Sequence, residues 1–291
     1  MSDTLVVNEI YLSLQGESTF AGLPCVFVRL TGCNLRCSYC DTAYAFTEGK
    51  KMALVDVQTE VGRLAKPFQD RPLALTPGFS PGTARRERAP DVSAASQVGH
   101  TAEPVASGAA AGPGLKPGVN EIALPLVELT GGEPLLQPNA PPLMKHLCDD
   151  GFTVLVETSG ALDISKVDPR VRRIMDLKCP GSGEVERNRW ENLAHLKATD
   201  EIKFVIGTVE DYAWAKQQIA THKLDLVCPL LMSWVHPLRP EQQDKALKRV
   251  PAGQTPISRL ELVERIIADA LPVRFQAQLH KIIWSPEQRG V

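Results

Sequence analysis

Short apolar runs alternate along this chain with longer amphipathic segments. Apolar runs rich in β-branched residues predict strands, whereas apolar residues that recur every three to four positions predict helices. This order is typical of a sheet of parallel strands joined by helical crossovers. The sequence therefore predicts an α/β fold, with strands at 6–14 (a strand or hairpin arm), 25–30, 126–129, 153–157, 173–176, 201–206, 226–230 and 274–278, and helices at 53–65, 140–150, 209–221 and 259–270.

The last predicted helix carries a clear apolar stripe. Leu260, Val263, Ile266 and Ile267 fall at helical spacing, and Ser258 stands where a helix N-cap is expected. We interpret this stripe as core packing rather than as part of a binding site.

Residues 68–119 break the alternation. This segment is dense in Pro, Ala, Gly and Ser and shows no hydrophobic period, so it cannot bury enough apolar surface to order itself. We interpret it as a disordered insertion, between the first helix and the next strand, within a single domain that spans residues 1–291. The alternative is a lid or partner-docking segment, because long loops in compact domains are usually either disordered or functional.

Composition narrows the class of protein. The chain has 291 residues, 43% of them hydrophobic, and a formal net charge of −2. A chain of this length can bury a full hydrophobic core. Its nearly balanced charge does not favour electrostatic binding to nucleic-acid phosphates, so we expect a small-molecule substrate. The sequence has no apolar run long enough for a membrane span, its polar start does not resemble a signal peptide, and its seven cysteines are an odd number. We therefore expect a reducing, cytoplasmic setting and no membrane contact.

Three cysteines stand close together at Cys33, Cys37 and Cys40. The spacing gathers three thiolates on one loop that begins where the 25–30 strand ends, and it supplies no fourth ligand. Structural zinc sites take four protein ligands, so three thiolates suit a four-iron, four-sulfur cluster whose remaining iron binds another group. The other cysteines lie singly in apolar segments and are interpreted as small buried hydrophobes: Cys25, Cys148, Cys179 and Cys228.

Polar motifs follow three of the predicted strands. Thr130-Gly131-Gly132-Glu133-Pro134 comes after the 126–129 strand, Glu157-Thr158-Ser159-Gly160 ends the next strand, and Asp176-Leu177-Lys178 ends the one after it. Parallel sheets build their sites at the carboxyl ends of strands, so these positions are candidates for ligand binding. The same residues are also ordinary turn formers, and that alternative stays open.

Together, the CxxxCxxC cysteines and the Gly-Gly-Glu-Pro turn resemble the radical S-adenosylmethionine superfamily. The resemblance implies a partial, incomplete TIM-type barrel that holds a [4Fe–4S] cluster and S-adenosylmethionine. Carried onto this sequence, it implies that the cysteines bind the cluster and that a further set contacts S-adenosylmethionine, namely Tyr39, Asp41, Gly132, Glu133, Ser159 and Lys178.

Other segments closely resemble the 7-carboxy-7-deazaguanine synthase family. They are Tyr11 to Ser18, Gly22-Leu23-Pro24, Phe27 to Leu30, Gly32 to Cys37, and a C-terminal His280-Lys281 pair. The resemblance implies a carbon–nitrogen lyase that converts 6-carboxy-5,6,7,8-tetrahydropterin to 7-carboxy-7-deazaguanine on the route to queuosine and related deazapurines. It also implies a magnesium ion.

The same resemblance assigns residues to the substrate. Leu14, Gln15, Gly16 and Glu17 would line the pterin pocket, with Thr130 and His280 as further contacts. Arg29 would hold the substrate carboxylate, because a guanidinium forks onto a carboxylate, and Thr42 would supply a hydroxyl to Mg²⁺. Simpler interpretations remain: a surface ion pair for Arg29, a helix cap for Thr42 and a structural role for His280.

The resemblance further implies an electron donor such as flavodoxin, a homodimer, and radical chemistry that contracts the pterin ring with loss of ammonia. Two other classes stay open from the residues alone. A radical-generating activase of a glycyl-radical enzyme would share the cysteine loop, and a non-enzymatic zinc-binding module could use the insertion for docking. The insertion and the tail after Trp284 depart from the family pattern, and their roles are not predicted.

Overall fold

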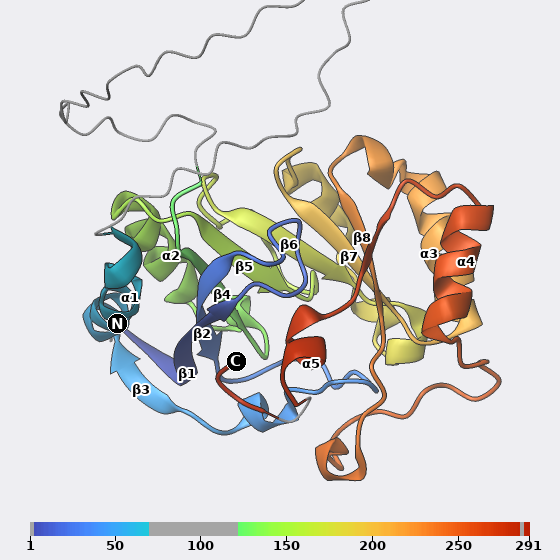
Figure 1. Cartoon of the computed structure of the whole chain (residues 1–291), viewed down its shortest axis with the longest axis horizontal. Helices are drawn as coiled ribbons and strands as arrows, with labels where there is room; N and C mark the ends of the chain where they lie inside the picture. The colour runs from blue at the N-terminus through green and yellow to red at the C-terminus, as the bar shows by residue number, and fades with distance from the viewer. Residues whose placement is uncertain (1–2, 70–121, 286–287) are drawn as a thin grey trace, which may run out of the picture. The chain divides into compact units, whose positions relative to one another are not determined.

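The computed structural model describes residues 3–69, 122–285 and 288–291. Within them, nine strands form one sheet in the order β3-β1-β2-β4-β5-β6-β7-β8-β9 (Figure 1). β1 pairs antiparallel with β2 and β3, and every pair from β2 to β9 is parallel. Because β3 and β9 are edges, the sheet is an open, incomplete barrel, as predicted. The strands are β1 (Thr4–Leu14), β2 (Pro24–Leu30), β3 (Lys50–Ala53), β4 (Leu126–Gly131), β5 (Val154–Thr158), β6 (Arg172–Leu177), β7 (Glu201–Ile206), β8 (Leu230–Trp234) and β9 (Arg274–Gln276).

Helices cover one face of this sheet. α1 (Leu54–Gln69) and α2 (Ala140–Asp149) pack on its first half, and α3 (Val209–His222) and α4 (Arg259–Ala268) pack on its second half (Figure 1). α5 (Leu279–Ile283) follows β9. None of the helices in these described residues is long and apolar enough to cross a membrane.

Alternation along the strands separates the core from the other face of the sheet. Val127 and Leu129 of β4 are fully buried in the core beneath the helices. Glu128 and Thr130 lie between and beyond them, and so point to the opposite face. That face carries polar side chains from successive strands, and it forms the pocket described below.

Helix caps match the sequence signals. Thr208 and Asp211 form a capping box at the start of α3, and the Ser258 side chain accepts a hydrogen bond of 3.1 Å from the backbone N–H of Glu261 at the start of α4. The predicted core stripe on α4 is wrong in part. Leu260 and Ile267 are 68% and 73% exposed, and the side chain that α4 buries is Leu262.

Several boundaries also differ from prediction. The apolar run at 226–230 does not form a strand: Leu226 ends a 3-10 turn and is 77% exposed, and β8 begins only at Leu230. An apolar run without alternation does not reveal its own register, and Pro229 cannot donate to a ladder. β9 ends at Gln276 rather than 278, β3 and α5 were not predicted, and α1 continues through 68 and 69. The rest of the predicted insertion lies outside the described residues.

Burial of the isolated cysteines largely agrees with prediction. Cys25, Cys179 and Cys228 are buried, while Cys148 is half-buried at the edge of the core.

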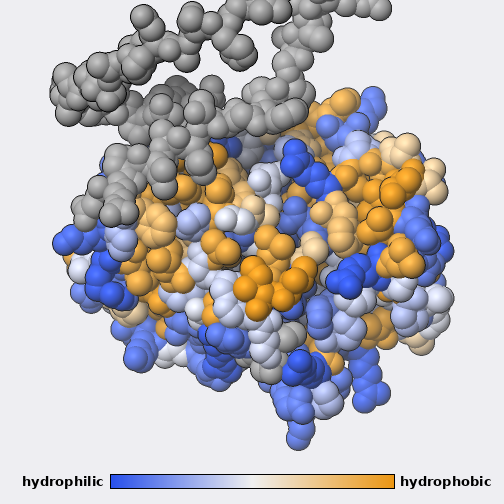
Figure 2. Space-filling model, in the orientation of Figure 1, coloured by the Kyte–Doolittle hydropathy of each residue, from blue (hydrophilic) through white to orange (hydrophobic). Residues whose placement is uncertain are grey.

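Figure 2 shows hydrophobic residues near α5 and near α4 on the visible face. Ile282 and Ile283 of α5 are among the exposed apolar side chains.

Candidate active site

One pocket opens on the polar face of the sheet, toward the carboxyl ends of the parallel strands. It brings together all of the predicted site residues except Glu133, although they come from segments far apart in the sequence. The predicted residues that line it are Leu14, Gln15, Gly16, Glu17, Arg29, Cys33, Cys37, Tyr39, Cys40, Asp41, Thr42, Thr130, Gly132, Ser159, Lys178 and His280.

The cysteine loop forms one side of this pocket. All three cysteines are free thiols, and burial raises their pKa values, that of Cys37 to about 11. Three thiols that stay protonated at neutral pH are poor nucleophiles but good ligands for a metal centre, which deprotonates the thiols that bind it. The donor set therefore fits an iron–sulfur cluster.

A single metal ion fits less well. Among the described residues, no group of three His, Cys, Asp or Glu side chains is arranged to hold one ion. Zinc needs its sulfur ligands about 2.3 Å from one centre, whereas a cubane cluster binds each cysteine through a different iron. The geometry therefore does not support the zinc-binding alternative.

The Gly-Gly-Glu-Pro turn packs directly against the cysteine loop. A Cβ on Gly132 would lie 2.1 Å from the backbone oxygen of Gly32 and 3.0 Å from Cβ of Cys33. Only glycine allows so close an approach. The backbone N–H of Glu133 also donates to the Gly32 oxygen at 2.8 Å, so the turn and the loop hold each other in place.

Glu133 itself does not line the pocket. Its carboxylate is fully buried and accepts hydrogen bonds from the backbone N–H of Leu135 and Ser159 and from the hydroxyls of Thr158 and Ser159, at 2.6–3.0 Å. These bonds tie the turn after β4 to the end of β5. The pocket is lined at this point by Gly131 and Gly132, and a contact between Glu133 and S-adenosylmethionine stays a prediction.

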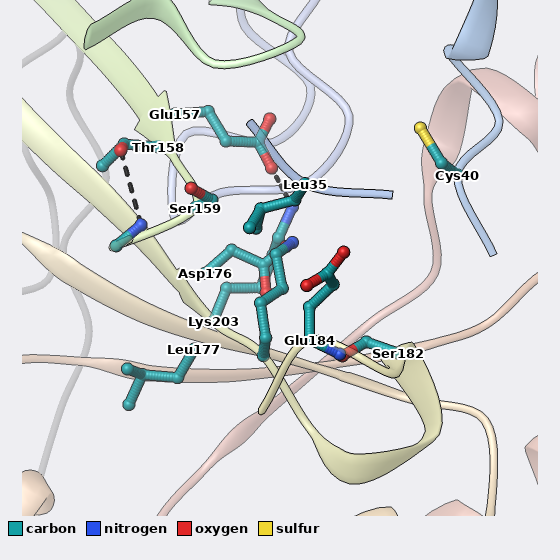
Figure 3. A network of polar contacts seen from close by, with 12 residues as sticks. Leu35, Cys40, Glu157, Thr158, Ser159, Asp176, Leu177, Ser182, Glu184 and Lys203 are labelled. Carbon is teal, nitrogen blue, oxygen red and sulfur yellow. Dashed lines mark hydrogen bonds and ion pairs between the residues drawn. The ribbon is translucent and has the colours of Figure 1, made fainter. Parts of the chain in front are cut away.

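Lys203 is the central charge of the pocket wall. The side chain is 4% exposed and forms an ion pair with Glu17 at 3.2 Å. It also pairs with Glu157 (Figure 3). Burial lowers the pKa of Lys203, but the two carboxylates outweigh burial and raise it well above its ordinary value. For Glu17 the two effects have the opposite signs. Burial raises the pKa of its carboxyl group, but the charge of Lys203 lowers that pKa to about 2. Lys203 and Glu17 are therefore both charged at neutral pH.

The side chain of Gln15 anchors the β1–β2 loop at the pocket wall. The side chain is 3% exposed. Its oxygen accepts from the backbone N–H of Glu17 at 2.5 Å and of Ser18 at 3.2 Å, and its amide nitrogen donates to Glu128 at 2.5 Å. These bonds fix the loop between β1 and β2, and so fix the direction of Glu17.

Arg29 lies at the other side of the pocket. Its Nε pairs with Glu9 at 2.7 Å, and its Nη2 donates to the hydroxyl of Tyr11 at 2.7 Å. The side chain is 14% exposed, so the ion pair with Glu9 is not a solvated surface pair. Nη1 has no hydrogen-bond partner among the described residues.

The C-terminal segment closes over the β1–β2 loop. The backbone N–H of Leu279 donates to the Gly16 oxygen at 3.1 Å, and the Gln278 amide donates to Glu17 at 3.0 Å. Lys281 forms an ion pair with Asp41 of the cysteine loop. Asp41, predicted as a cofactor contact, thus has a cation partner within the protein, and the pairing seats His280 at the pocket edge.

The remaining predicted residues differ in how their polar atoms are used. Lys178 pairs with Asp176 at 2.7 Å, and the Thr130 hydroxyl lies 3.4 Å from a Glu157 oxygen. Thr42 occupies the N-cap position of a short 3-10 helix, but its side chain makes no capping hydrogen bond. The hydroxyl oxygen of Tyr39 is buried and has no partner among the described residues.

Sequence reasoning missed part of the pocket wall. Glu128, Lys203, Gln278 and Lys281 all line the pocket. A signal was available for the first two. Each is a charged residue at an alternate position of an otherwise apolar strand, which is typical of a strand with one polar, ligand-facing side.

The open barrel, the three-cysteine loop and the glycine-rich turn on one pocket define a radical S-adenosylmethionine enzyme. No family model matches the chain. The chain is 36% identical over 287 residues to the 7-carboxy-7-deazaguanine synthase of Koribacter versatilis, covering 98% of this chain and 99% of the relative. It is 34% identical over 290 residues to the synthase of that name from Chlorobaculum tepidum, covering 99% and 97%. The chain belongs to the 7-carboxy-7-deazaguanine synthase family.

A solved structure supports the fold. The crystal structure of QueE from Escherichia coli is similar with a TM-score of 0.54 and 21% sequence identity, over 94% of both chains. Membership of the synthase family also decides against the activase alternative.

Proposed function

We propose that this chain converts 6-carboxy-5,6,7,8-tetrahydropterin to 7-carboxy-7-deazaguanine, with ring contraction and loss of ammonia, as a step toward queuosine and related deazapurines. The observation that carries the proposal is the shared pocket. The three free cysteines and the charged wall of Glu17, Lys203 and Arg29 line the same cavity, so a small polar heterocycle bound to the wall would lie beside the metal centre.

Cys33, Cys37 and Cys40 would hold the [4Fe–4S] cluster, and the glycine turn with Ser159 and Lys178 would hold S-adenosylmethionine. When bound, these groups supply a radical that removes a hydrogen atom from the substrate. The protein contributes position and exclusion of water. The packing of Gly132 against Cys33 sets the distance between the turn and the cysteine loop.

The polar wall suits the substrate. The Glu17 carboxylate would accept hydrogen bonds from the amino-substituted ring, and the unpaired side of Arg29 would hold the substrate carboxylate. Thr130 and His280 would complete the contacts. Because Arg29 is anchored by Glu9 and Tyr11, its charge is positioned before substrate arrives, which lowers the entropic cost of binding.

A magnesium site at Thr42 is part of the proposal. Magnesium prefers oxygen ligands and commonly combines one protein oxygen with substrate oxygens and water. Two features of Thr42 support it: the residue lines the pocket, and its hydroxyl is not used as a helix cap.

We also propose a homodimer that takes electrons from a donor such as flavodoxin. Exposed apolar side chains on α4 and α5 support an assembly, because a subunit interface would remove Leu260, Ile267 and Ile282 from water. Light scattering of the cluster-loaded protein tests the dimer, and reduction by purified flavodoxin tests the donor.

The deciding experiment is anaerobic reconstitution with iron and sulfide, then incubation with 6-carboxytetrahydropterin, S-adenosylmethionine, Mg²⁺ and reductant. Mass spectrometry is expected to detect 7-carboxy-7-deazaguanine, and none with Cys37→Ala. Cys228→Ala is the matched control, because Cys228 is a buried free cysteine that does not line the pocket; it should retain iron and activity. Formation of methionine and 5′-deoxyadenosine without the deazaguanine would contradict the substrate, and a colourless protein that binds no iron would contradict the class.

A further inference from the structure

Glu128 is a carboxyl group in the pocket wall that the proposed roles do not use. It lies on β4 with its side chain on the polar face, beside Phe27 of β2 and Leu155 of β5 in the strand register. It is 1% exposed and lines the pocket. A carboxyl group so deeply buried needs a reason, because burial without partners is costly.

One oxygen of Glu128 has a defined partner. The amide oxygen of Gln15 accepts from two backbone N–H groups, those of Glu17 and Ser18, which fixes the orientation of the amide. Its nitrogen must therefore face Glu128, where it donates to Oε2 at 2.5 Å. Oε1 has no hydrogen-bond partner among the described residues.

The charges around Glu128 favour its neutral form. Within the part of the chain that the structure describes, the ammonium that acts on Glu128 is that of Lys203, and it is already paired with Glu17 and Glu157. Burial and the charge of Glu157 raise the pKa of Glu128 to about 8, while Gln15 and Lys203 lower it by less. The titratable groups that face it come from β1, β2, β5, β7 and the β1–β2 loop, and they are Tyr11, Cys25, Glu157, Lys203 and Glu17.

We propose that Glu128 is a further substrate-binding residue, which accepts a hydrogen bond from Gln15 with one oxygen and donates one from its other, protonated oxygen to an acceptor on the pterin ring. The inference rests on the proposed function. A pyrimidinone ring presents acceptors, its carbonyl oxygen and ring nitrogen, beside its N–H donors. Glu17, whose pKa lies at about 2, is ionised and can only accept, and the ammonium of Lys203 is already paired with Glu17 and Glu157. A protonated Glu128 therefore adds a hydrogen-bond donor to this part of the wall.

The test is the pH dependence of substrate binding. Cluster-loaded protein with S-adenosylmethionine, but without reductant, is titrated with 6-carboxytetrahydropterin from pH 6.5 to 9. Wild-type affinity should fall roughly tenfold between pH 7 and 9, since one proton is lost from the donor. Glu128→Gln keeps an acceptor for Gln15 and a donor for the ring but cannot ionise, so its affinity should stay close to the wild-type value at pH 7 and not share that fall. Titration of the ligand itself affects both proteins equally and cancels in the comparison.

Two further variants separate binding from loop anchoring. Glu128→Leu removes both hydrogen bonds and should weaken binding at least tenfold at pH 7. Glu201→Gln is the matched control: Glu201 is also a buried carboxyl group on this face and anchors Thr19 of the same loop, but it does not line the pocket, so wild-type pH dependence should persist. Parallel pH profiles for wild type and Glu128→Gln would overturn the inference. A wild-type protein that neither binds nor converts the pterin would instead overturn the proposed function.

Discussion

Gly16 and His280 are packed so closely that no side chain fits between them. A Cβ on Gly16 would lie 2.9 Å from Nδ1 of His280 and 3.3 Å from its backbone nitrogen. The backbone bond from Leu279 to the Gly16 oxygen, 3.1 Å long, holds the two segments together. The glycine therefore sets how near the C-terminal segment comes to the pocket.

Gly16→Ala should displace His280 and weaken substrate binding. The histidine ring can rotate, but its backbone nitrogen cannot yield without moving α5, and a shift of about 1 Å at a site can cost on the order of a hundredfold in rate. We expect kcat/KM to fall by roughly ten- to a hundredfold, with a small change in the midpoint of thermal unfolding. Gly62→Ala is the control, because a Cβ on Gly62 meets nothing within 4 Å; an equal loss in both variants would contradict the packing argument.

Lys203→Met should destabilise the protein and remove activity. The substitution keeps the volume but leaves Glu17 and Glu157 facing each other without their cation. Breaking one side of a buried ion pair costs about 3–5 kcal/mol, which urea unfolding at pH 7 would measure. Lys145→Met breaks an exposed pair with Asp149 and should cost less than about 1 kcal/mol.

The same variant should change the response to acid. The pKa of Glu17 is lowered to about 2 in the folded protein, below the ordinary value of about 4.3. Its contribution to stability is therefore complete above pH 4.3 and is lost as the pH falls from there toward 2. Without Lys203 the pKa of Glu17 rises, so this contribution to folding should be lost at a higher pH. Unfolding curves at pH 7, 5 and 4 would contradict this account if both proteins lost stability in parallel.

Local patterns predicted the parts of the site that are continuous in sequence. Cys33 to Cys40 lie on one loop, and the motif from Thr130 to Glu133 stands at the end of β4, so spacing and strand ends were sufficient to find them. The order of strands and helices followed from hydrophobic periodicity in the same way. These features depend on residues within a few positions of one another.

Partners that depend on strand register were not predictable in the same way. The Lys203 pairs with Glu17 and Glu157 join three separate segments of the chain, and Glu133 turned out to brace two strand ends. The exposed Leu260 shows a similar limit of prediction from sequence. Helical spacing indicates which residues share a face of the helix, but it does not indicate which face packs against the core.

Glu184→Ala should loosen the cysteine loop. Glu184 accepts from the backbone N–H of Arg36 at 2.7 Å and pairs with Lys248 at 2.9 Å. Its removal leaves a partly buried N–H unpaired, which costs about 1–3 kcal/mol. In the reconstituted protein, iron release to a chelator should be several-fold faster, followed by the loss of visible absorbance. Glu186→Ala, at an exposed position on the same turn, should release iron at the wild-type rate; equal rates in all three proteins would show that Glu184 does not brace the loop.

Thr42→Val should raise the magnesium requirement without affecting the cluster. Valine matches threonine in shape but has no oxygen, and Mg²⁺ prefers oxygen ligands. The Thr42 hydroxyl lies 3.7 Å from Sγ of Cys40, so an ion bound there would lie beside the cluster loop. We expect the Mg²⁺ concentration for half-maximal activity to rise roughly tenfold, as expected for losing one ligand worth about 1.4 kcal/mol, while iron content stays constant. Thr42→Ser keeps the hydroxyl and should behave as wild type. A loss of iron in Thr42→Val, or an unchanged Mg²⁺ response, would instead mean that the residue only supports the fold of the loop.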